Sequence, residues 1–192
     1  MQMRRCMRGP ANVLLTVGVI AAMTLAGGTA SAASPDATSI VGRWQQAHRC
    51  QQLVDALDAL GLGAIAPSVV GDYFPDQTAE ELAAKSDICS GATPIQHSHF
   101  FTSAGLFGSL DQYWNQVDDG TYVMVDRDTV AINGATFDFA LQGDTLSLTP
   151  RITDRQRREA LRDPLEFSTA GWMVAVSYPG TNWKSVPCFG WC

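Results

Sequence analysis

The chain has 192 residues, of which 46% are hydrophobic and 17% charged, and its 19 acidic residues outnumber its 13 Lys and Arg residues. The formal net charge of −6 makes nucleic acids and anionic membrane surfaces poor partners, so we expect no nucleic-acid partner. The length allows one domain with a substantial hydrophobic core.

The first 32 residues have the features of a secretory signal peptide. Three arginines lie among the first eight residues, an apolar run covers residues 11–26, and Ala30-Ser31-Ala32 fits the A-x-A rule for a cleavage site. The apolar run is shorter than the roughly 20 residues that a membrane-spanning helix needs, and no second run follows. We therefore predict an exported protein without a membrane span, with residues 33–192 as its single domain.

Residues 33–192 carry a formal charge of −9, because three of the 13 Lys and Arg residues and none of the 19 acidic ones lie in the predicted signal peptide. Four cysteines remain after Cys6 is removed, and an even number in an exported domain predicts two disulfides, with three possible pairings. We favour Cys50–Cys89 and Cys188–Cys192, because these pairs bracket separate segments. A zinc site is the alternative, which the cysteine spacing disfavours; we expect no cofactor.

The N-terminal part of the domain is predicted to contain one strand and a helical insertion. Residues 39–47 read as the strand. Apolar residues then recur at helical spacing over residues 49–60, and Pro67 suits the start of a short helical turn. Thr78 and Glu81 have the spacing of a capping box, which predicts a second helix. The insertion is assigned to residues 49–90, closed at its base by the Cys50–Cys89 disulfide.

Strands resume after residue 93. Residues 95–102, 106–110 and 113–117 read as strands, and Asp119-Gly120 is a hairpin dipeptide. This register would place Trp114 opposite Val125, and Gln116 opposite Val123.

Residues 121–150 predict four short strands joined by three tight turns. Asn133-Gly134 suits a type I′ turn, and the other turns are placed at Arg127-Asp128 and Gly143-Asp144. All three registers agree on one apolar face, which a one-residue slip would destroy. That face comprises Val123, Val125, Val130, Ile132, Phe137, Phe139, Leu141, Leu146 and Leu148.

The C-terminal part is predicted to contain a helix and a last strand. Thr153 and Gln156 form a second capping box, which opens a helix that Pro164 limits. Residues 172–178 read as the last strand, followed by a short aromatic tail. The fold class is therefore mainly β: a single up-and-down antiparallel β-barrel of about 8–9 strands, with a helical insertion after the first strand and a helix before the last.

This layout, together with Gly42-x-Trp44 on the first strand, resembles the lipocalin-like (calycin) barrels. Their G-x-W signature lies on the first strand, and they carry a large first loop where this chain has its helical insertion. The resemblance implies a barrel that holds a small molecule in its interior.

We accordingly predict that a small hydrophobic molecule binds in the barrel lumen. A concave, mostly apolar site with few polar groups suits such a ligand. The alternative is a filled interior without a cavity, since some barrels of about eight strands are filled by side chains and others hold one small ligand. The expected lumen residues are Gln112, Trp114, Gln116, Val123, Val125, Val130, Phe137, Phe139 and Leu148.

A second hypothesis is a barrel enzyme, either an isomerase or cyclase or a metal-dependent enzyme, that uses His97 and His99. These residues alternate along one strand, so their rings share a face with Cα atoms about 7 Å apart. A metal site would need a further ligand, for which Asp111 and His48 are the candidates. The competing interpretation is that both histidines are hydrogen-bonded structural residues.

A third hypothesis is a secreted surface or inhibitor module. It would act through the aromatic side chains of the tail, Trp183, Phe189 and Trp191, and it requires an exposed apolar patch there.

Overall fold

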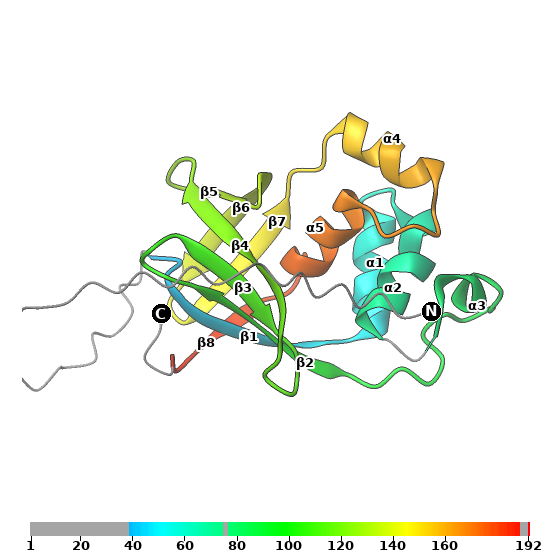
Figure 1. Cartoon of the computed structure of the whole chain (residues 1–192), viewed down its shortest axis with the longest axis horizontal. Coiled ribbons are helices and arrows are strands. Elements are labelled where there is room, and N and C mark those ends of the chain that lie inside the picture. Colours follow the sequence, from blue (N-terminus) through cyan, green and yellow to red (C-terminus); the bar gives the residue numbers. More distant parts are fainter. Residues whose placement is uncertain (1–38, 75–76, 189–191) are drawn as a thin grey trace, which may run out of the picture. The chain divides into compact units, whose positions relative to one another are not determined.

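Figure 1 shows the computed structural model of the chain, which describes residues 39–74, 77–188 and 192. The predicted signal peptide, with its cleavage site after Ala32, lies outside these residues, and so do Phe189 and Trp191. In chain order the elements are β1 (Gly42–His48), α1 (Cys50–Ala59), the 3₁₀ helix η1 (Gly63–Ile65), α2 (Ala66–Tyr73), α3 (Ala79–Ala83), β2 (Ile95–Phe101), β3 (Leu106–Leu110), β4 (Gln116–Met124), β5 (Thr129–Ile132), β6 (Ala135–Gln142), β7 (Thr145–Pro150), α4 (Asp154–Arg162), α5 (Thr169–Ser177) and β8 (Trp183–Val186).

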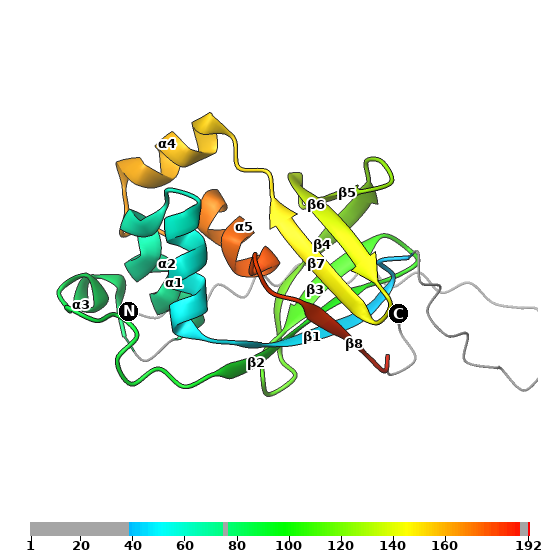
Figure 2. The same cartoon turned by 180° about the vertical axis from the view of Figure 1, so that it is seen from behind.

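The eight strands of the described residues form a closed barrel (Figures 1 and 2). Each strand pairs antiparallel with its neighbours in the sequence, and β8 returns to pair with β1, joining Arg43 to Val186 and Gln45 to Lys184. The predicted fold class is confirmed, including the helical insertion after the first strand. Both predicted capping boxes are also present, at the start of α3 and of α4.

Two of the predicted hairpins have the expected register. Asn133-Gly134 has φ angles of 50° and 80°, as a type I′ turn requires. Gly143-Asp144 joins β6 to β7 and places Leu141 opposite Leu146. The buried inward-facing side chains of these hairpins include Val130, Phe137, Phe139, Leu146 and Leu148.

The turn predicted at Arg127-Asp128 is wrong. The loop between β4 and β5 is longer, and a hydrogen bond of 2.9 Å from the main-chain N–H of Val125 to the carbonyl oxygen of Thr129 closes it. Met124 therefore lies opposite Val130, where Val125 was expected.

This shift of one residue inverts the faces of β4, because neighbouring side chains in a strand point to opposite sides. Tyr122 is buried, whereas Val123 is 65% exposed and Val125 is 59% exposed. The inward orientation expected for these two valines is wrong.

The hairpin predicted at Asp119-Gly120 is also wrong, since both residues lie within β4 and pair with β3. The chain turns earlier, over residues 111–115, where Oδ1 of Asp111 accepts hydrogen bonds of 2.8 Å from two main-chain N–H groups of the loop. Gly120 serves a close approach instead, because a Cβ atom there would lie 1.7 Å from Oδ1 of Asn133.

The segment predicted as the last strand, residues 172–178, is helical and belongs mainly to α5. Ser168 begins this helix, accepting a hydrogen bond of 3.2 Å from the N–H of Gly171. Because α5 is buried on nearly all sides, its sequence has no polar face, and a short apolar run does not distinguish a strand from a buried helix. The last strand is β8, which begins at Trp183.

The helices α1, α2, α4 and α5 lie together at one end of the barrel, with α5 next to the strands (Figures 1 and 2). Gly171 allows α5 to approach α2, since a Cβ atom there would lie 2.8 Å from Val69 Cγ2. Trp183 Nε1 donates a 3.1 Å hydrogen bond to the carbonyl oxygen of Ser177, which joins α5 to β8. None of the described helices combines the length and the apolar character that crossing a bilayer would take.

The opposite end of the barrel is filled by apolar side chains. The ring centroid of Phe101 lies 5.3 Å from that of Phe107 and 5.1 Å from that of Tyr122. The hydroxyl of Tyr122 donates a 2.7 Å hydrogen bond to the carbonyl oxygen of Thr102, which satisfies its only polar atom. The barrel thus has an apolar end and an end covered by helices.

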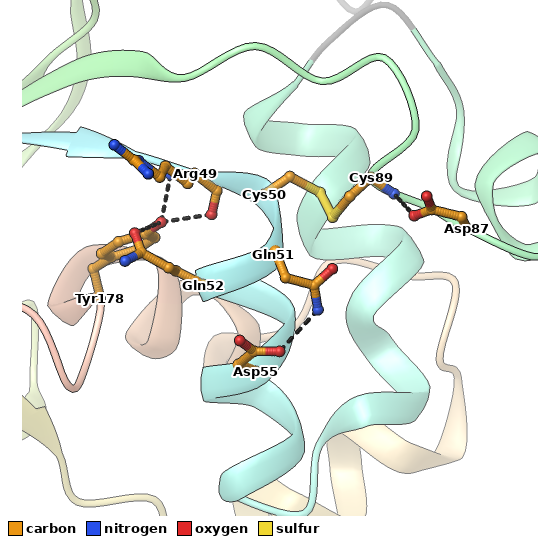
Figure 3. The surroundings of a disulfide bond; sticks show 8 residues. All are labelled: Arg49, Cys50, Gln51, Gln52, Asp55, Asp87, Cys89 and Tyr178. Carbon is orange, nitrogen blue, oxygen red and sulfur yellow. Dashed lines mark hydrogen bonds between the residues drawn. A yellow bond between two sulfur atoms is a disulfide. The ribbon is translucent and has the colours of Figure 1, made fainter.

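The two predicted disulfides are confirmed. Cys50 at the start of α1 is bonded to Cys89, and Cys188 is bonded to Cys192 (Figure 3 shows the first bridge). At the same end of α1, the Tyr178 hydroxyl donates a 2.6 Å hydrogen bond to the carbonyl oxygen of Arg49. The two ends of the helical insertion are therefore joined to each other, and its start is held by the residue that follows α5.

Removing the Cys50–Cys89 bridge through the Cys50→Ser and Cys89→Ser double variant should cost about 4 kcal/mol of unfolding free energy by the loop-entropy relation. The bridge closes a loop with a sequence separation of 39, so its loss releases much conformational freedom in the unfolded chain. Urea unfolding without reductant measures the change.

The matched control is the Cys188→Ser and Cys192→Ser double variant, whose bridge has a sequence separation of only 4. The same relation gives about 2 kcal/mol for that loop. An equal or larger loss of stability in the control would contradict the assignment of the first bridge as the main covalent constraint.

Candidate functional site

A pocket of about 360 Å³ opens at the end of the barrel that the helices cover. Its walls come from α2, β2, β3, the loop between β3 and β4, the start of β4, and α5 with the segment before it. The lining residues are Asp72, Tyr73, Ile95, His97, Ser109, Asp111, Gln112, Tyr113, Val117, Asp118, Phe167 and Trp172.

The strand register explains why polar side chains gather at this end. His97 and His99 alternate along β2 and both are buried. His99 pairs with Ser109 on β3, and Ser109 pairs with Asp118 on β4, so one row crosses three strands. These positions carry histidine, serine and aspartate where the opposite end of the barrel carries phenylalanine and tyrosine.

All three histidines of the chain stack at this end. The ring centroids of His48 and His97 are 5.0 Å apart, and those of His97 and His99 are 5.2 Å apart. The His48 ring also lies parallel to that of Tyr178, with centroids 4.0 Å apart. The stack runs from the wall of the pocket toward α5 and β8.

The three histidines differ in their hydrogen bonds. His99 is fully satisfied, with Nδ1 2.8 Å from the Ser109 hydroxyl and Nε2 2.8 Å from the carbonyl oxygen of Val176. Among the described residues, Nε2 of His97 and both ring nitrogens of His48 have no hydrogen-bond partner. Buried polar atoms without partners are rare, and they indicate a water molecule or ligand as the missing partner.

Burial keeps the stack uncharged. It lowers the pKa of His97 to about 4 and places the pKa of His48 and of His99 well below the usual value, because an imidazolium in this environment loses its hydration. At neutral pH the three rings are therefore neutral imidazoles.

Three carboxyl groups line the pocket, and their pKa values are shifted in different directions. Burial raises the pKa of Asp118, opposed in part by the hydrogen bond of 2.7 Å that Trp172 Nε1 donates to its Oδ2. Burial likewise raises the pKa of Asp72. Asp111 differs: burial alone would raise its pKa, but hydrogen bonds from Asn115 and Tyr113 lower it overall.

The arrangement does not form a metal centre within residues 39–74, 77–188 and 192. No group of three or more His, Cys, Asp or Glu side chains there could hold a metal ion. His99 has no free nitrogen for a metal, since both take part in hydrogen bonds. The hypothesis of a metal-dependent enzyme gains no support from this geometry.

The predicted lumen residues are found in three places. Gln112 lines the pocket. Val130, Phe137, Phe139 and Leu148 are buried in the barrel interior, where they pack against one another and their neighbours. The exposed residues are Trp114, Gln116, Val123 and Val125.

Trp114 illustrates the effect of the earlier turn. It lies in the loop between β3 and β4 rather than in a strand, and its ring stacks on the outer side of the barrel against Arg43, with the guanidinium carbon 3.9 Å from the ring centroid. The expected pairing of Trp114 with Val125 is therefore wrong, as is that of Gln116 with Val123.

The tail hypothesis loses one of its three aromatic residues. Trp183 is fully buried as the first residue of β8 and contacts His99, with ring centroids 4.1 Å apart. Phe189 and Trp191 lie outside the described residues.

Several pocket residues were not predicted from the sequence. Asp72 and Tyr73 end α2, and Phe167 and Trp172 come from the segment around the start of α5. For Asp118 the sequence does carry a signal, since an aspartate at an inward-facing strand position is unusual in an apolar barrel. The others depend on how the helices dock.

A comparison with models of known protein families found no match to this chain, and neither did a comparison with curated proteins.

The stability of the fold should fall as the pH falls from 7 to 4. Each histidine is neutral in the folded protein but binds a proton in the unfolded chain below about pH 6.5, so the unfolded state takes up more protons. For His97, the drop of the pKa from 6.5 to about 4 corresponds to about 3 kcal/mol lost by pH 4. Urea unfolding at intervals between pH 7 and pH 4 measures this loss.

The variants His48→Phe and His97→Phe keep an aromatic ring and remove the titrating group, so each should flatten the pH dependence between pH 6.5 and 5. An unchanged stability of the natural chain over this interval would contradict the assignment of buried neutral histidines.

Proposed function

We propose that this protein is an exported β-barrel that binds one small, largely apolar molecule in the pocket at its helical end. The pocket volume of about 360 Å³ falls in the range of small-molecule sites, which runs from about 300 to 1,000 Å³. Aromatic and aliphatic side chains make much of its wall, and a few polar groups converge on it. This combination is typical of sites that bind a small molecule and fix its orientation.

The observation that carries this proposal is the state of His97. It lines the pocket, is only 5% exposed, and has an Nε2 atom without a hydrogen-bond partner in the described part of the chain. A buried nitrogen of this kind costs about 1–3 kcal/mol if it stays unpaired. A polar group on a bound molecule would remove that cost.

The proposed binding residues differ from those that the sequence suggested. The barrel interior beneath the pocket is occupied by the histidine stack and Trp183, which fill it with side chains. We therefore assign binding to the pocket residues His97, Gln112 and Trp172, of which only Gln112 belongs to the predicted lumen set.

Binding is tested with a neutral lipophilic dye such as Nile red, followed by fluorescence and by native mass spectrometry. The expected result is one dye molecule per protein, with binding weakened at least tenfold by Trp172→Ala, because the indole forms part of the pocket wall. Trp114→Ala is the matched control, since that indole lies outside the barrel and should leave binding unchanged.

Equal loss of binding in the two tryptophan variants would contradict the pocket assignment. A broad screen of small molecules without any binder would contradict the proposed function.

Export is part of the proposal. Two disulfides in a chain of this length favour an oxidising compartment, and the first 32 residues have the pattern of a signal peptide. N-terminal sequencing of the protein secreted by an expressing cell should give Ala33 as the first residue. An N-terminus at Met1 in the secreted material would contradict the assigned cleavage site.

A barrel enzyme is the second candidate, favoured by one observation. His97 is a neutral imidazole at the wall of a pocket that also holds Asp118, whose pKa is raised by burial. Groups with shifted pKa values cluster at catalytic sites, where they act as general acids or bases. His99 is not a candidate catalytic residue in this hypothesis, since both of its ring nitrogens are hydrogen-bonded, to Ser109 and to Val176.

The two candidates differ in what happens to the bound molecule. A binding protein returns the ligand with unchanged mass after hours of incubation. An enzyme converts it, and His97→Gln would then abolish conversion. Native mass spectrometry of the loaded protein over time distinguishes these outcomes.

A further inference from the structure

We propose that the molecule bound in this pocket is an organic cation, an amine carried on a flat apolar body, and that Asp72 and Asp118 are its counter-ions. This inference rests on the proposed function and adds the chemical class of the ligand.

The first argument is the balance of charge around the pocket. Three aspartates line it, and no Lys or Arg is among the described lining residues. The three ion pairs of the described residues lie elsewhere, on α4 and on the strands β6, β7 and β8 with their flanking turns. The histidine in the wall is neutral at physiological pH. The pocket therefore presents negative charge without a protein cation to balance it.

The second argument separates the three carboxylates by their partners. Asp111 is occupied by its own loop, where Oδ1 accepts hydrogen bonds from the N–H groups of Tyr113 and Asn115 and Oδ2 accepts one of 2.9 Å from Nδ2 of Asn115. It has a structural role in the turn. Asp72, and Asp118 whose Oδ2 accepts one hydrogen bond from Trp172, are the two pocket carboxylates that this loop does not hold.

These two carboxylates and Tyr73 line the same pocket. Burial raises the pKa of the partly buried Tyr73, and the negative charges of Asp72 and Asp118 raise it further. The indole of Trp172 holds Asp118 in place from α5 through its 2.7 Å hydrogen bond. Asp72 is exposed at the rim and Asp118 is half-buried, and partial desolvation raises the pKa of both carboxyl groups. A bound cation would favour their charged forms.

An independent observation indicates that the pocket takes a ligand. The Nε2 atom of His97 is buried in the wall without a hydrogen-bond partner in the described part of the chain. This observation is independent of the acidic side chains. A surface that only exposes carboxylates to water has no need of a buried imidazole beside them.

The side chains of the pocket wall would contact the apolar body of the ligand. Tyr73, Tyr113, Phe167 and Trp172 line the pocket together with the aliphatic Ile95 and Val117. Aromatic faces attract cations through the negative charge above their rings, and they bury a flat apolar body. Carboxylates with several aromatic rings make a site for an amine and a poor site for an anion.

The test uses three ligands with the same aromatic body and different charge: 2-phenylethylamine, 2-phenylethanol and 3-phenylpropanoate. Isothermal titration calorimetry at pH 7 should show that the amine binds the natural chain at least about tenfold more tightly than the alcohol, as expected for hydrogen bonds to a charged group. The carboxylate should bind more weakly than the alcohol.

The variants Asp72→Asn and Asp118→Asn keep the shape of the side chain and remove its charge, so each should reduce the preference for the amine over the alcohol. Asp128→Asn is the matched control, because Asp128 is exposed in the loop between β4 and β5, and it should leave the preference unchanged. Near-ultraviolet circular dichroism checks that each variant is folded.

The outcomes separate this inference from the proposed function. If the natural chain binds Nile red but takes the amine and the alcohol equally, the choice of ligand class is overturned and the binding function stands. If neither Nile red nor any of the three ligands binds, the proposed function is overturned, and the ligand class with it.

Discussion

The polar side chains that point into one end of the barrel need hydrogen-bond partners in a place with little water, and this requirement shapes the helical end of the molecule. The helix α5 supplies two of the partners from its last turn, where the carbonyl oxygens of Val176 and Ser177 accept hydrogen bonds from His99 and Trp183. A helix has unpaired carbonyl groups at its C-terminus, so the end of α5 is suited to this role. The position of α5 in turn fixes Trp172 beside Asp118 and so forms one wall of the pocket.

Not all of these polar side chains have their hydrogen bonds, and the unpaired ones lie beside the pocket. His99 is fully bonded, but His97 and His48 retain buried nitrogens without partners in the described residues. A protein selected for stability alone would replace such groups by apolar side chains of similar shape, at little cost or with a gain. Their presence beside a pocket favours a functional reason for the polar end of the barrel, since violations of packing rules concentrate at functional sites.

The sequence predicts the parts of the fold that local chemistry decides. Asn133-Gly134 and Gly143-Asp144 specify their turns through glycine at positive φ, and both registers are found in the structure. Arg127-Asp128 has no such residue, and there the chain forms a longer loop that shifts β4 by one position. The segment at residues 172–178 has the apolar pattern of a strand although it is helical, because a helix buried on nearly all sides lacks the polar face that marks an exposed helix. The pocket cannot be predicted from the sequence, since Asp72, His97 and Trp172 meet only after α2 and α5 dock on the strands.

Closure of the barrel has a further effect on how molecules of this kind could associate. Each of the eight described strands has a neighbour on both sides, so the ring offers no open strand edge to which another chain could add by main-chain hydrogen bonding. The seam is narrowest between β7 and β8, which share only the pairs Thr145–Lys184 and Leu146–Trp183. Strand addition at this seam would require β7 and β8 to separate, which would expose the fully buried indole of Trp183 to water.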